Sequence, residues 1–209
     1  MSEELLGFQL RVDYDQVPNW SSDERAKYLL VESVSVPLSV DTTVWPISGD
    51  QSMLSRIFED YSSEPFSSPN GMSIYRLRVA LELLDRREGS VPIAITTLNE
   101  DADDLKTSHR IEDVGYTVAD LSARGWQRLG YDVADRWLTS GLMNCGYATT
   151  EKQALKASYG GLINDHHLFR ETSDAIAFSV QCSARVAEHA PFLVYGIWSN
   201  LEPGRPLGT

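Results

Sequence analysis

Two of the chain's four histidines stand side by side in the stretch GLINDHHLF, residues 161–169, next to an aspartate. Histidine and aspartate ligate zinc and also act as acids and bases in catalysis. However, adjacent side chains diverge in regular structure, and zinc requires three or four ligands, so His166 and His167 would need further partners. Asn164 and Asp165 follow two glycines, which is a composition typical of turns. We therefore interpret the stretch as a structural turn and predict no metal site.

A second pair of residues with chemical potential is Cys145, in the segment MNCGY, and His189. Helices predicted over 150–159 and 173–188 are joined by a short connection, so they should form an antiparallel hairpin. Residues that flank the hairpin on either side then lie at the same end of it, far from the double histidine. Because a helix N-terminus and a nearby histidine both favour a thiolate, a Cys145–His189 dyad for thiol chemistry is one hypothesis. The alternative is that Cys145 is a small buried side chain, as we predict for Cys182.

The net charge of the chain, −12, is unusual for a globular protein of 209 residues, and it is unevenly distributed. Residues 1–64 contribute 12 acids and 4 bases, and residues 99–113 contribute 6 acids and 2 bases. Such a surplus argues against nucleic-acid binding, which requires basic side chains, and against docking on an anionic membrane. It favours a basic protein partner, which the negative field would attract.

The segment 99–113, NEDADDLKTSHRIED, concentrates this charge and has few apolar residues, so we expect an exposed loop or a short polar helix. Three interpretations are open: a solvated segment, a contact surface for a basic partner, or a calcium loop. The segment has no glycine for the sharp turn of a calcium loop. The predicted partner-binding residues are the six acids Glu100, Asp101, Asp103, Asp104, Glu112 and Asp113. This profile is similar to that of immunity proteins that neutralise basic bacterial toxins.

The remaining composition indicates a soluble, cytoplasmic protein. Two cysteines do not make a disulfide framework, the N-terminus MSEELLGFQL is acidic where a signal peptide would be basic, and no apolar run approaches a membrane span. Phosphate-binding glycine loops, the nucleophile elbow and the metalloprotease helix signature are all missing from the sequence. We therefore expect no cofactor, and a binding or inhibitor protein is favoured over an enzyme. The sequence gives no oligomeric state.

The order of predicted elements indicates an α+β fold. The predicted strands cover 5–12, 32–40, 91–98 and 192–198. The predicted helices cover 19–30, 49–62, 72–89, 117–142, 149–161 and 172–189. Strands and helices do not alternate regularly, which disfavours a doubly wound sheet. We expect a strand-rich first half and a helix-rich second half with a helical hairpin at about 150–188, and a closing strand that returns to the sheet. The chain, 1–209, is predicted to form one domain, with 99–113 as an alternative subdomain boundary.

Three local expectations concern the helices of the second half. The segment 117–142 is expected to form either two helices or one helix that is broken near Gly125 or Gly130. The helix over 149–161 should open with Thr150 and Gln153 in capping-box register. The buried stripe of the helix over 172–189 is predicted to be Ile176, Val180 and Ala184.

Overall fold

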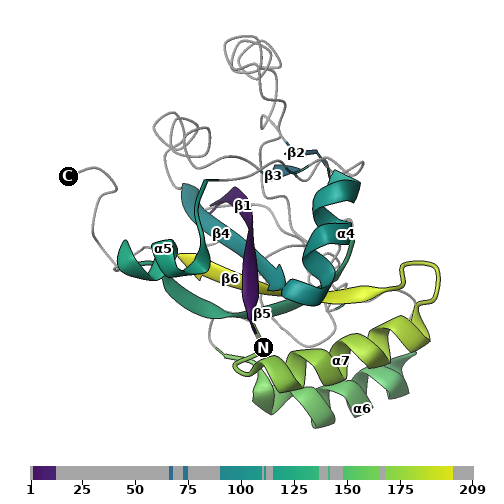
Figure 1. Cartoon of the computed structure of the whole chain (residues 1–209). Helices are drawn as coiled ribbons and strands as arrows, with labels where there is room; N and C mark the ends of the chain where they lie inside the picture. Colours follow the sequence, from purple (N-terminus) through teal and green to yellow (C-terminus); the bar gives the residue numbers. More distant parts are fainter. Residues whose placement is uncertain are drawn as a thin grey trace, which may run out of the picture.

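A four-stranded antiparallel sheet organises the chain in the computed structural model (Figure 1). The described residues are 2–12, 66–67, 73–74, 90–109, 111, 115–136, 141, 148–164 and 168–199. The strands of the sheet are β1 (Glu3–Val12), β4 (Ser90–Leu98), β5 (Gln127–Asp135) and β6 (Phe192–Ser199). Their order across the sheet is β1-β4-β6-β5, and two short strands, β2 (Phe66–Ser67) and β3 (Ser73–Ile74), pair separately.

The described residues form four α-helices, and three of them pack on this sheet. The four helices are α4 (Asn99–His109), α5 (Val118–Ala123), α6 (Thr149–Tyr159) and α7 (Thr172–Arg185), and a 3-10 turn, η2 (Gly160–Leu162), follows α6. Helix α4 packs on β1 and β4, α5 on β1, and α7 on β5 and β6. Figure 1 shows α6 and α7 side by side beneath the sheet. No described helix is long and apolar enough to span a membrane.

The predicted α+β class is confirmed, as is the closing strand. Strand β6 lies between β4 and β5 and pairs antiparallel with both. The helical hairpin is also present: Glu151, early in α6, forms an ion pair with Arg185, at the end of α7. At the other end of α6, the ring of Tyr159 packs on that of Phe178, with ring centroids 5.0 Å apart. The two helices therefore run antiparallel.

The predicted break near Gly125 is present, but the prediction that the chain is helical beyond it is wrong over Gln127–Asp135, which form β5. Helix α5 ends at Ala123, and β5 begins four residues later. Residues 130–135 of β5 are buried, so the strand lacks the alternation of apolar and polar residues that marks a half-exposed strand. It also contains Gly130 and two aspartates, types that are depleted in strands. Gly130 has a φ of 152° and marks a register shift against β6, which is the conformation of a β-bulge.

The predicted contacts of the hairpin helices need two corrections. In α7 the buried side chains are Ala175, Phe178, Ser179 and Cys182, whereas Val180 is 65% exposed. The side of α7 that carries Phe178 therefore faces the core, and the predicted side through Val180 and Ala184 faces outward.

In α6 the N-cap is Ala148, whose backbone N–H donates to the Glu151 carboxylate at 2.8 Å. The predicted Thr150 and Gln153 therefore do not form the capping box.

The stretch GLINDHHLF closes the outer edge of β5. The Asn164 side chain donates to the Leu129 carbonyl at 2.7 Å, and Phe169 exchanges two backbone hydrogen bonds with Tyr131 at 2.8 and 2.9 Å. An uncovered strand edge invites pairing with other chains, so these bonds protect the sheet. The prediction of a structural turn agrees with the role of Asn164. Residues 165–167, which include both histidines, lie outside the described residues.

A polar network crosses the sheet from β1 to β5. The Glu3 carboxylate, 8% exposed, accepts hydrogen bonds from Thr96 at 2.7 Å and Tyr131 at 2.9 Å, and it forms an ion pair with Arg128. Gly196 lies between Thr96 and Tyr131 in the register. A Cβ atom at Gly196 would lie 2.2 Å from the Thr96 hydroxyl and 2.8 Å from the Glu3 carboxylate. The missing side chain thus leaves the space in which the network forms.

Several predicted elements cannot be compared with this fold. The helices over 19–30 and 49–62 and the strand over 32–40 lie outside the described residues. The helix over 72–89 does so for most of its length, and Ser73–Ile74 at its start belong to strand β3.

Candidate partner-binding site

Residues 99–109 of the acidic segment form helix α4, and Ile111, which follows the helix, is buried in the core. Ala102 and Leu105 are buried and join α4 to the sheet. Glu100 and Asp101 lie in the first turn, where carboxylates interact favourably with the helix dipole. Of the two expected conformations, a loop or a short polar helix, the helix is correct. The favourable interaction of these two carboxylates with the helix dipole explains why a segment with so few apolar residues is helical.

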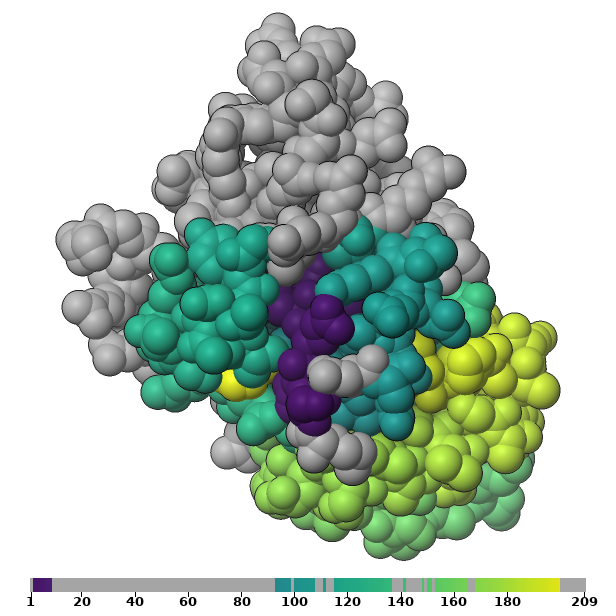
Figure 2. Space-filling model, viewed as in Figure 1, coloured from purple at the N-terminus to yellow at the C-terminus, as the bar shows by residue number. Residues whose placement is uncertain are grey.

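The exposed side of α4 is negative. Glu100, Asp103 and Asp104 are exposed, and no ion pair connects them to a basic residue in the part of the chain that is described. Lys106, the single base of the helix, is paired with Glu4 of β1. Figure 2 shows the region of α4 at the surface beside β1. The outward side of the helix therefore presents three carboxylates, and its own base does not neutralise them.

The charges on α4 affect one another. Burial raises the pKa of Asp101 above its usual value, and the neighbouring carboxylates of Glu100 and Asp104 raise the pKa further. Asp101 is half-buried, whereas its two neighbours are exposed. A carboxyl group that holds its proton more tightly because of adjacent carboxylates indicates a locally negative field. This field is what a basic partner would neutralise.

Replacing Asp101 with asparagine tests this crowding. Because the folded-state pKa of Asp101 is raised, its contribution favours folding only at acid pH and is lost as the pH rises above about 4. We expect Asp101→Asn to be more stable than the control Asp103→Asn by about 0.5 kcal/mol at pH 7. Both variants lose a carboxylate near the same helix N-terminus, so the dipole effect cancels. Urea unfolding at several pH values measures the difference, which should vanish at acid pH. A difference that is independent of pH would contradict the interpretation.

Two of the six predicted contact residues, Glu112 and Asp113, lie outside the described residues. The structure therefore places Glu100, Asp101, Asp103 and Asp104 together on one helix and says nothing of the other two. Among the described residues, no group of three or more histidine, cysteine, aspartate or glutamate side chains could hold a metal ion.

The predicted thiol site is described at only one of its two residues. Cys145 lies outside the described residues, so its distance from His189 stays untested. His189 lies in the turn between α7 and β6, and its Nδ1 is 3.1 Å from a carboxylate oxygen of Asp135, at the end of β5. The sequence pattern gave no signal for Asp135, because residues 127–135 were predicted to be helical and form strand β5. Cys182 is buried in α7, as predicted, with its sulfur 3.8 Å from the Gly141 carbonyl oxygen.

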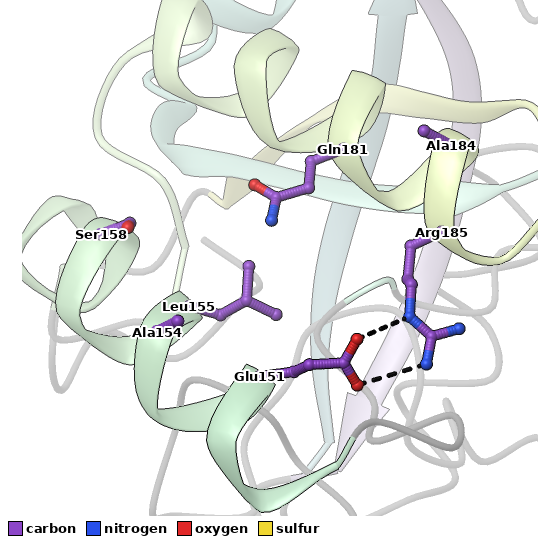
Figure 3. Close-up of a pocket in the computed structure, with 7 residues that line it drawn as sticks. All are labelled: Glu151, Ala154, Leu155, Ser158, Gln181, Ala184 and Arg185. Atoms are coloured by element: carbon purple, nitrogen blue, oxygen red, sulfur yellow. Dashed lines mark hydrogen bonds and ion pairs between the residues drawn. The ribbon is translucent and has the colours of Figure 1, made fainter.

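The hairpin contributes a hollow of about 410 Å³ between α6 and α7. In Figure 3, Leu155 and Gln181 point into this space, and Glu151 and Arg185 close one end with two hydrogen-bonded contacts of 3.1 and 3.3 Å. The remaining lining residues are Ala154, Ser158 and Ala184. Since the two charged side chains of the lining neutralise each other, the hollow is a weaker candidate for recognition than α4.

Comparison of the chain with protein-family models, with curated protein sequences and with solved structures finds no match.

Proposed function

We propose that this chain is an acidic protein that binds a basic protein partner through the exposed side of α4 and inhibits it. The observation that carries the proposal is the row of exposed carboxylates Glu100, Asp103 and Asp104. Negative charge on a rigid element attracts a basic partner during the encounter and disfavours acidic competitors. The net charge of −12 supports the same choice of partner and disfavours nucleic acid.

The proposal also includes the kind of basic protein that is inhibited and the place where the two proteins meet. A basic toxin made in the same cell is the kind of partner that an acidic protein of this size would neutralise. The low cysteine content is compatible with the reducing cytoplasm, which is where we place the encounter.

Affinity capture at two salt concentrations tests the proposal. The chain is immobilised and exposed to lysate of its source cells at about 50 mM salt, and bound proteins are eluted at about 500 mM, since the screening length falls steeply over this range. We expect one basic protein in stoichiometric amount, retained at low salt and released at high salt. Recovery of no such protein, or of an acidic one whose retention is independent of salt, would contradict the proposal.

A further inference from the structure

The turn between α7 and β6 holds a histidine against a buried carboxylate. His189 Nδ1 lies 3.1 Å from Asp135 Oδ2. The Asp135 side chain is 1% exposed, whereas that of His189 is 36% exposed. The Nδ1 edge of the imidazole thus contacts a buried carboxylate, and the rest of the ring is partly exposed to solvent. This is the arrangement by which enzymes orient a histidine base.

The fold fixes both members of the pair. Asp135 is the last residue of β5 and is paired in register with Phe192 of β6. Its carbonyl oxygen accepts a hydrogen bond of 3.1 Å from the buried Tyr195 hydroxyl. On the other side, the His189 backbone N–H donates to the Val186 carbonyl at 3.0 Å. The pair is therefore held by backbone geometry at both ends.

The hydrogen bond determines the tautomer of the imidazole. A carboxylate accepts hydrogen bonds and does not donate them, so the hydrogen lies on Nδ1 and the lone pair of the neutral ring lies on Nε2. The carboxylate of Glu188, which is 78% exposed, lies 3.7 Å from Nε2. Arg136, exposed and next to Asp135 in sequence, is the basic residue of this end of β5.

We propose that His189 is a nucleophilic and basic site for activated acyl groups and that Asp135 is its positioning residue. Nε2 attacks the carbonyl carbon of an ester, the bond to the leaving alkoxide or phenolate breaks, and an Nε2-acyl-imidazolium forms that keeps its hydrogen on Nδ1. Water then adds to the acyl carbon and the C–N bond breaks, which gives the carboxylic acid and the neutral imidazole. The proton that water releases neutralises the alkoxide or phenolate to the alcohol or phenol. The site needs no residue of α4, so it is independent of the proposed partner binding.

Two measurements test the site, with p-nitrophenyl acetate as the probe. We expect the full chain to hydrolyse the ester faster than the same buffer without protein. The rate should fall at least about tenfold in His189→Gln, and the control His109→Gln should leave it unchanged. Imidazole NMR of the unsubstituted chain should show His189 with its hydrogen on Nδ1.

Replacing Asp135 with asparagine separates positioning from simple support of the turn. The amide group can donate to Nδ1, which moves the hydrogen of the ring to Nε2 and removes the exposed lone pair. We expect this tautomer change by NMR, and an ester hydrolysis rate at least about tenfold lower in a variant that remains folded. Unchanged hydrolysis in His189→Gln, or a hydrogen on Nε2 in the unsubstituted chain, would overturn the proposal.

Discussion

Replacing Gly196 with alanine is expected to lower the free energy of unfolding by about 2–4 kcal/mol. The added methyl group would lie 2.2 Å from the Thr96 hydroxyl, and Thr96 is fully buried. Thr96 also donates to the Glu3 carboxylate, so relief of the clash must move a group that links β1 to β4. Urea unfolding followed by circular dichroism measures the loss.

Gly160 is the matched control for this substitution. It lies at the C-cap of α6 with φ −57° and ψ −38°, and nothing lies within 4 Å of the position of a Cβ atom. Alanine there should be neutral or stabilise by up to about 1 kcal/mol, because it restricts the unfolded chain. If Gly196→Ala is as stable as Gly160→Ala, the polar network does not fill the space above Gly196.

Replacing Phe178 with alanine is expected to cost about 3–5 kcal/mol, because the variant loses a fully buried ring and leaves a cavity. The ring packs between Tyr159 of α6 and Phe169, with centroids 5.0 and 5.2 Å away. It therefore joins both helices of the hairpin to the segment that covers the edge of β5. Thermal unfolding and urea unfolding should both report the loss.

Val180, on the opposite side of the same helix, gives the comparison. Its side chain is 65% exposed, so Val180→Ala should change the stability by no more than about 0.5 kcal/mol. The sequence pattern alone predicts the reverse, since it places Val180 in the buried stripe. Equal losses in the two variants would show that α7 does not pack as described.

The sequence predicted those elements whose signal is local. Strands β1, β4 and β6 are rich in β-branched, aromatic and leucine side chains, and the helices of the hairpin have the expected positions. Strand β5 was missed because its burial comes from the helices and strands packed around it, and its own residues include Gly130 and two aspartates. The buried side of α7 was missed for a similar reason, since two stripes of the helix are apolar and the sheet selects the one with Phe178.

The two candidate sites also differ in how far their residues lie apart along the sequence. The carboxylates of α4 are neighbours along the chain, so their clustering could be predicted from the sequence alone. The pairing of Asp135 with His189 joins residues 54 positions apart in the sequence and depends on the register of β5 with β6. No local pattern contains that information. For Cys145, the sequence supplies a hypothesis that the described residues do not test.

The most direct test of partner binding compares two triple variants that have the same change of net charge. The dissociation constant of each variant for the captured basic protein is measured, and the ratio of the two constants is the result. The first carries lysine in place of the α4 acids Glu100, Asp103 and Asp104. The second carries lysine in place of three acids in and around α7, namely Glu171, Asp174 and Glu188. Since charges that face the partner govern association, we expect the first variant to bind about 10- to 100-fold more weakly than the second at low salt. Equal affinities of the two variants would contradict the assignment of α4 as the binding surface.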